Sequence, residues 1–147
     1  MGLRFEFDVT GVDGVEEALD ELGDQLMPAL VNGLRKGAAA VSATARELVP
    51  VDTGELQKSI RARAPTVDGN TASVEVKATA EHALYVEMGT GERGAASTFP
   101  EGMEAAPSYA TGHGGQEAQP YMFPALKQNE PRIREELANA VKKAVNG

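Results

Sequence analysis

The residues with the strongest claim to chemistry lie in one glycine-rich segment. Gly89, Gly91 and Gly94 fit the pattern G-x-G-x-x-G. That pattern binds a dinucleotide when the glycines open a helix whose amide groups meet a pyrophosphate inside a βαβ unit. Residues 95–100 have no helical periodicity, and no parallel strand is expected after them. The context therefore favours a flexible hinge over a dinucleotide site.

Histidine and carboxylate residues offer little else for catalysis. His82 and His113 are 31 residues apart and outside any H-E-x-x-H pattern, so the spacing of a metal site is missing. The chain has no cysteine, which excludes thiolate ligands, disulfides and a cysteine nucleophile. Nothing places two carboxylates across a cleft, as glycoside hydrolysis requires, and only 5% of residues are aromatic. We therefore expect no enzymatic activity, no metal and no cofactor; the carboxylates considered were Asp52, Glu55, Glu81 and Glu87.

The composition predicts one soluble domain. The chain has 147 residues, of which 41% are hydrophobic, and it contains no run of about 18 apolar residues that could span a membrane. Residues 3–8 alternate charged with apolar side chains, so they do not resemble a secretory signal. We expect synthesis in the cytoplasm and no membrane partner.

The net charge of −8 is unevenly distributed along the chain. Residues 1–30 carry −7, residues 31–65 carry +3, residues 66–119 carry −6 and residues 120–147 carry +2. An acidic chain is a poor candidate for binding nucleic acid, because affinity for phosphates comes from Lys and Arg. The acidic surface either serves solubility or repels DNA so that DNA slides past it.

Hydrophobic periodicity predicts an amphipathic helix that follows a first strand. Residues 3–9 alternate as in a half-buried strand, and Asp13 with Glu16 resembles a capping box at a helix start. An apolar stripe continues to Leu48, and Pro28 predicts a kink or break near residues 26–28. The small residues 37–40 permit close approach of another backbone, either within the monomer or from another subunit.

The second half of the chain predicts a hairpin, a long loop and a last helix. Residues 59–64 and 73–79 read as strands around a turn at 67–70, and residues 80–88 favour a helical turn over a strand. Residues 89–119 read as a loop, mobile in an isolated subunit. After Pro120 a helix follows, with Pro131 as a kink or a helix start.

The predicted fold class is α+β, in a single domain of residues 1–147. A small antiparallel sheet, made of the N-terminal strand and the hairpin, packs against a long kinked helix and a C-terminal helix.

Three blocks, residues 45–60, 85–91 and 119–126, carry a family resemblance. The first block is a predicted helix that ends in P-x-x-T-G-x-L-x-x-S-I. The second block contains Y-V-E-x-G-T, and the third reads Q-P-x-x-x-P-A-L. In this order they resemble the tailed-phage head-to-tail joining or tail-component proteins typified by the tenth gene product of phage HK-ninety-seven. The motif positions are Pro50, Asp52, Thr53, Gly54, Leu56, Ser59, Ile60, Tyr85, Glu87, Gly89, Thr90, Pro120, Pro124 and Ala125.

Residue chemistry gives physical reasons for some of these positions. Thr53 and Gly54 supply a local capping oxygen and tolerance of positive φ, which suit a sharp reversal after the long helix. Glu87 either accepts backbone N–H bonds from the adjacent glycine segment or pairs with an arginine such as Arg61 or Arg63, in the same or a neighbouring subunit. These roles are either folding roles or subunit contacts.

The resemblance implies a structural virion protein of the phage neck that joins head and tail. It implies a ring, a hexamer or a dodecamer, through which DNA passes without sequence-specific binding. The partners would be connector or head-completion proteins and tail-terminator or tail-tube proteins. The alternative is a tail terminator or assembly protein that caps the tail tube. Residues 92–119 form a longer loop than the family pattern, and we expect its large apolar residues to reach the next subunit or the channel; these are Phe99, Met103 and Tyr109.

Overall fold

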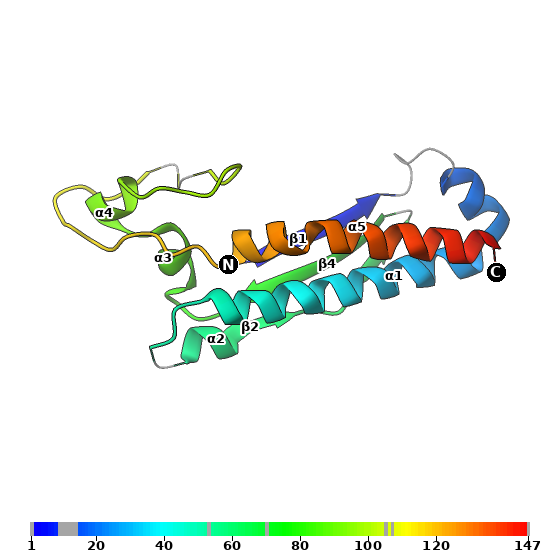
Figure 1. The fold of residues 1–147 in the computed structure, drawn as a ribbon, viewed down its shortest axis with the longest axis horizontal. Helices are drawn as coiled ribbons and strands as arrows, with labels where there is room; N and C mark the ends of the chain where they lie inside the picture. Colours follow the sequence, from blue (N-terminus) through cyan, green and yellow to red (C-terminus); the bar gives the residue numbers. More distant parts are fainter. Residues whose placement is uncertain are drawn as a thin grey trace.

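The fold is elongated, with its sheet and two long helices parallel to the long axis (Figure 1). The computed structural model describes the backbone of residues 2–8, 15–52, 54–69, 71–104, 106 and 108–146, and within these ranges the side chains of residues 25–144. A third region, made of short helices and loops between residues 80 and 120, lies at one end. The predicted α+β class is confirmed.

The sheet is antiparallel and centres on β4 (Thr71–Ala78). β1 (Gly2–Asp8) pairs along one edge of β4, while β2 (Ile60–Ala62) and β3 (Thr66–Asp68) follow one another along the other edge. The register places the apolar positions of β1 opposite the buried positions of β4; the pairs are Leu3 with Val76, Phe5 with Val74 and Phe7 with Ala72. The N-terminal strand and the hairpin are therefore confirmed.

Two details of the hairpin were predicted wrongly. The strand expected over residues 59–64 is shorter, because β2 covers only Ile60–Ala62. A further strand, β3, follows after a segment that contains Pro65, which cannot donate a ladder hydrogen bond. The turn expected over 67–70 is shorter, because Asp68 already pairs with Thr71. Gly69 supplies the left-handed conformation of that tight turn, with φ of 60°.

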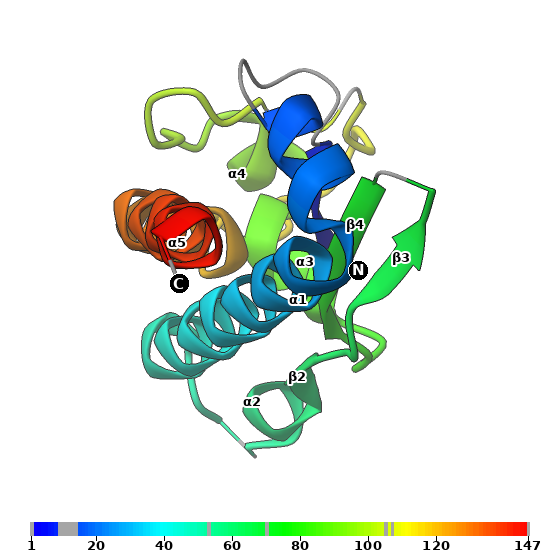
Figure 2. The same cartoon turned by 90° about the vertical axis from the view of Figure 1, so that its right-hand side faces the viewer.

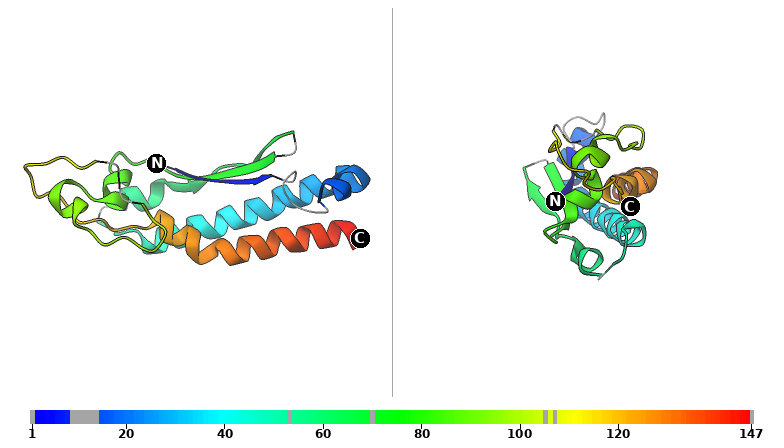
Figure 3. Two further views of the ribbon diagram at one scale, coloured as in Figure 1. Left: turned by 90° about the horizontal axis from the view of Figure 1, so that it is seen from above. Right: turned by 90° about the vertical axis from the view of Figure 1, so that its left-hand side faces the viewer.

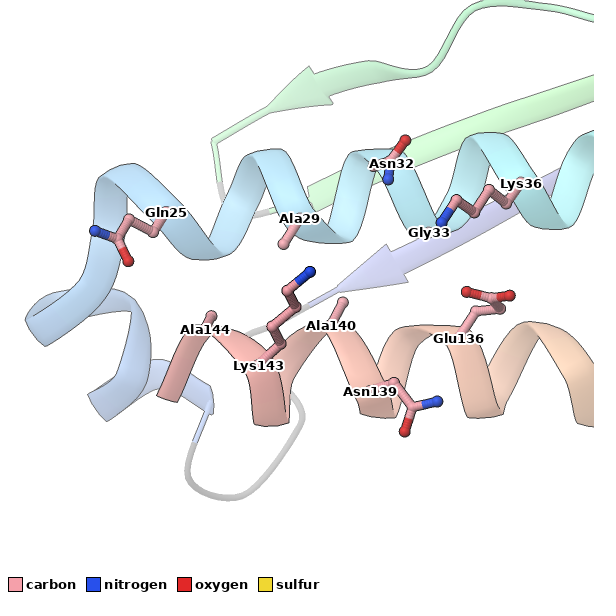
Figure 4. Close-up of a pocket in the computed structure, with 10 residues that line it drawn as sticks. All are labelled: Gln25, Ala29, Asn32, Gly33, Lys36, Glu136, Asn139, Ala140, Lys143 and Ala144. Atoms are coloured by element: carbon pink, nitrogen blue, oxygen red, sulfur yellow. The ribbon is translucent and has the colours of Figure 1, made fainter. Parts of the chain in front are cut away.

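The long helix α1 (Val15–Leu48) is continuous through Pro28. Its first turns point away from the axis of the remainder, and Figure 4 shows Gln25 close to this bend. Pro28 has no N–H to donate to the carbonyl four residues before it, so the bend falls on its N-terminal side. The predicted kink is confirmed, and a complete break is not present. The proposed capping box lies partly outside the described residues.

One stripe of α1 faces the core. α1 lies between the sheet and α5 (Met122–Asn146), as the end-on and top views show (Figures 2 and 3). It ends at Leu48, because the residue before Pro50 is pushed out of the helical region. Its buried apolar side chains are Leu26, Leu30, Leu34, Ala38, Val41 and Ala45.

Small residues on α1 allow α5 to approach closely. A Cβ added at Gly37 would lie 2.8 Å from Cγ1 of Ile133, and one at Gly33 would lie 3.3 Å from Cδ2 of Leu137. Ala38 is buried, whereas Ala39 is exposed. Residues 37–40 were expected to pack closely either within the monomer or against another subunit. For Gly37, the packing is within the monomer. α5 also runs through Pro131, so of the two alternatives predicted there, a kink or a helix start, the helix start is wrong.

Three short helices complete the part of the chain that the structure describes. α2 (Glu55–Ser59) follows the α1 corner, and α3 (Ala83–Met88) confirms the helical turn expected over residues 80–88. α4 (Gly91–Ala95) lies inside the segment predicted to be a loop, so that prediction is wrong for these five residues. Thr90 also forms a β-bridge with Gln116 across the base of the remaining loop.

Candidate functional site

A buried carboxylate joins the second and third sequence blocks. Glu87 in α3 has a relative exposure of 1%. Its Oε1 accepts hydrogen bonds from the backbone N–H groups of Tyr121 at 2.9 Å and Met122 at 2.8 Å, and its Oε2 accepts one from Phe123 at 3.2 Å. These N–H groups begin α5 and have no partner within the helix. Glu87 is therefore the N-terminal cap of α5, and its charge also favours that end of the helix dipole.

Glu87 accepts backbone N–H groups, as one interpretation expected, but the donors belong to the start of α5 instead of the glycine segment. The carboxylate does not bind the glycine segment, and Arg63 instead lies 3.7 Å from Glu75. One local signal pointed to a distant cap: residues 118–121 read Ala-Gln-Pro-Tyr, which contains none of the usual N-cap side chains. A helix that starts without a local cap needs an acceptor from elsewhere, and sequence alone does not say from where.

Tyr121 makes a second connection between these blocks. Its hydroxyl donates a hydrogen bond to the carbonyl oxygen of Ala83 at 2.9 Å, and its ring is fully buried. Burial, together with the negative charge of Glu87, raises the pKa of the Tyr121 phenol far above its usual range. The phenol thus stays neutral and keeps its donor. Nearby, Gln119 N–H donates to the carbonyl oxygen of Val86 at 2.8 Å.

The first block forms a fixed corner at the end of α1. The Arg46 guanidinium donates to the carbonyl oxygen of Ile60 from Nε at 2.9 Å and from Nη2 at 2.6 Å, while Gln57 Nε2 donates to the carbonyl oxygen of Arg46 at 2.9 Å. Gly54 adopts φ of 80° at the reversal, as expected. Ser59 Oγ closes the last turn of α2 on the Leu56 carbonyl oxygen at 2.8 Å.

The motif residues thus divide into buried and exposed positions. Pro50, Asp52 and Tyr85 are exposed, Pro120, Pro124 and Thr90 are half-buried, and Thr53 lies outside the described residues. Pro124 occupies the first turn of α5, where a missing N–H costs no helix bond. All three blocks contribute to one core, through Leu56 and Ile60 from the first, partly buried Val86 from the second, and Tyr121, Met122 and Ala125 from the third.

The glycine segment is closely packed rather than hinge-like. A Cβ at Gly89 would lie 2.7 Å from the backbone N of Ala118, and one at Gly94 would lie 2.8 Å from Cε1 of Tyr109. Thr90 N–H donates to the carbonyl oxygen of Gln116 at 2.9 Å. The glycines therefore let residues 109–118 lie against α3 and α4, which accounts for their spacing without a bound phosphate.

The loop residues expected to reach a neighbour are only half-buried. Phe99, Met103 and Tyr109 share this intermediate exposure, and the Tyr109 hydroxyl donates to the carbonyl oxygen of Met88 at 2.9 Å. The more exposed apolar side chains nearby are Leu84 and Tyr85, at 53% and 56%. They line a hollow of about 430 Å³. Leu84 was not among the predicted interface residues, because its helical turn gave no indication of which face was free.

A larger hollow of about 490 Å³ lies between α1 and α5 (Figure 4). Small residues such as Ala29 and Ala140 line it together with Lys36, Lys143 and Glu136, and the last two point from α5 toward α1. The described residues contain no group of three His, Asp or Glu side chains that could hold a metal ion. None of the described helices is long and apolar enough to cross a membrane.

A comparison with known protein families identifies the family to which the chain belongs. A family model described as "Bacteriophage HK97-gp10, putative tail-component" matches residues 13–89, just over half of the chain. The match spans α1, the hairpin and α3, and it ends beside Glu87. No curated protein and no solved structure matches the chain. The chain belongs to the HK97-gp10-like family of phage tail components.

Proposed function

We propose that this protein is a structural component of the phage neck that joins head and tail as a ring of identical subunits. The observation that carries the proposal is the family match over residues 13–89. A tail component acts by holding other virion proteins in place, so its surface rather than a catalytic cleft performs its function. Double-stranded DNA passes through the ring without sequence-specific contacts, which fits the net charge of −8.

The packing of α5 supports a single domain of residues 1–147. α5 lies outside the matched residues, yet it is capped by Glu87 from within them, and its Ile133 and Leu137 pack into the shared core. Because α5 and the matched residues share one core, we expect the subunit to contact its neighbours as one rigid domain. We therefore treat the chain as one assembly unit located in the virion, with assembly in the host cytoplasm.

The experiment is a measurement of native mass by light scattering with negative-stain imaging across a concentration series. A closed ring with a central hole, a hexamer or a dodecamer, is the expected result. Mixing the protein with the connector and with the tail-tube protein then distinguishes head–tail joining from the alternative role of capping the tail tube. A monomer at every concentration, alone and with both partners, would contradict the ring.

A further inference from the structure

Four basic side chains gather beside α2 on the open face of the sheet. Lys58, Arg61, Arg63 and Lys77 line one hollow of about 380 Å³, here called the basic groove. Lys58, Arg61 and Arg63 are exposed, and Lys77 is half-buried. This concentration of positive charge stands out on a chain in which acidic residues outnumber basic ones by 22 to 14.

Among the side chains that the structure describes, few compensate the positive charges of the groove. Arg61 is directly opposite Lys77 in the β2–β4 register, and like charges in this arrangement destabilise a sheet. Arg63 approaches Glu75 at 3.7 Å. Among the residues whose side chains the structure describes, Lys58, Arg61 and Lys77 have no ion-pair partner. An anionic partner would remove this repulsion, so the groove is suited to one.

A complementary surface exists elsewhere on the same chain. Residues 81–117, here called the acidic lobe, expose five carboxylates and a single basic side chain, Arg93. No ion pair is formed by these carboxylates among the described side chains. Seen end on, α4 of the lobe and α2 of the groove lie on opposite sides of the molecule (Figure 2). The exposed carboxylates are Glu81, Glu92, Glu101, Glu104 and Glu117.

We propose that the basic groove of one copy binds the acidic lobe of the next copy. This inference rests on the proposed ring and specifies its subunit contact. Two different patches form a head-to-tail interface, which is the kind that closes into a ring when the rotation fits. The charges set the register and the rate of encounter, while apolar contacts supply much of the affinity. Tyr85 and Leu84, exposed on the lobe side, are available for those contacts.

DNA phosphate is the other anion the groove could attract, but the charge balance favours a protein partner. The five carboxylates of the lobe belong to the same molecule as the groove, so a DNA duplex lying along it would meet both signs of charge. Four cations neutralise only a few phosphates, which gives weak, salt-sensitive binding. A second copy of the chain instead offers five exposed carboxylates, which is close to the number of basic side chains in the groove, four.

Paired charge reversal tests this contact. Variant A carries Arg61→Glu and Lys77→Glu, and variant B carries Glu92→Lys and Glu117→Lys. Each variant alone places like charges against like charges, so we expect the concentration for half-assembly to rise about tenfold or more at low salt. An equimolar mixture should assemble as the unmodified protein does, because each variant's groove then meets the other's lobe. That rescue also shows that both variants fold.

Matched controls carry the same charge changes on other exposed positions. Arg132→Glu with Lys142→Glu corresponds to variant A, and Glu47→Lys with Glu135→Lys corresponds to variant B. We expect both to assemble normally alone.

If variants A and B assemble like the unmodified protein, or if the mixture does not restore assembly, the contact is overturned while the ring stands. Anisotropy with a DNA duplex completes the test: variant A losing DNA affinity with assembly intact would assign the groove to DNA. An unmodified protein that never assembles would overturn the ring and the contact together.

Discussion

A buried carboxylate that accepts three backbone N–H groups is costly to remove, because the donors stay buried when the acceptor is lost. Glu87 is such a residue, and it could not be identified from sequence since its partners lie 34 to 36 residues away. The block that contains Glu87 was recognisable, and so was the helix start that it caps. What sequence lacked was the fold that brings α3 to the first turn of α5.

We predict that Glu87→Ala lowers the free energy of unfolding by about 3 kcal/mol, because it removes a helix cap and leaves buried donors unpaired. Glu87→Gln should cost less, since one amide oxygen still accepts. Urea unfolding measured by circular dichroism checks both values. Glu135→Gln, an exposed change on α5, is the control and should be neutral. Equal stability of the two Glu87 variants and the unmodified protein would contradict the capping role.

Tyr121 predicts a dependence of stability on alkaline pH. Its pKa is raised in the folded state, so above the ordinary tyrosine pKa of about 10 the unfolded chain releases a proton that the folded chain retains. The unfolded state then binds fewer protons, and stability falls as pH rises, by up to about 1.4 kcal/mol per pH unit. Tyr121→Phe should remove this part of the slope between pH 9 and about 11, as seen in urea midpoints at each pH. At neutral pH it should cost about 1 kcal/mol, for the lost bond to Ala83.

At the scale of elements, long amphipathic periodicity was predictable and short irregular pieces were not. The stripe of α1 and the alternation in β4 repeat over many residues, so they identified both elements. β3 is a three-residue strand just after Pro65, and α4 contains two glycines within its five residues. Neither has a local pattern, because both depend on contacts with distant segments, β4 for one and residues 113–116 for the other.

The contact between α1 and α5 gives a pair of matched predictions. Gly37→Ala should destabilise the protein by about 1 kcal/mol net, because the clash with Ile133 outweighs the gain in helix propensity. Gly33→Ala should be neutral or stabilising, since the Leu137 methyl group 3.3 Å away can shift. Thermal or urea unfolding compares the two. The double variant Gly37→Ala with Ile133→Ala should show a favourable coupling, and its absence would mean that α1 and α5 are further apart.

At the scale of the whole molecule, the part that identifies the family does not contain the whole hydrophobic core. The matched residues end at Gly89, but Tyr121, Met122 and Ala125 fill the core beside α3. A fragment of residues 1–89 would expose that core and leave the Glu87 carboxylate without its donors. The order of the three sequence blocks indicated the relationship, yet it did not reveal that the last block completes the fold of the first two.

We therefore predict that residues 1–89 expressed alone are unfolded or aggregated, as judged by amide chemical-shift dispersion and rapid proteolysis. Adding a peptide of residues 119–147 in excess should restore dispersion, because the helix and its cap can form between two chains. The same peptide carrying Ile133→Glu is the control and should not restore it. A fragment that folds unaided would show that α5 is an addition to an independent core.

The Glu87 cap and the Val86–Gln119 bond have one more consequence, for the history of the chain. They hold residues 86–87 and 119–123 side by side, so the two ends of the intervening segment are anchored whatever its length. Closing a loop twice as long costs only about 0.6 kcal/mol more. A lineage can therefore lengthen, shorten or replace this segment without disturbing either helix, and new contacts to a changing neighbour can arise there first.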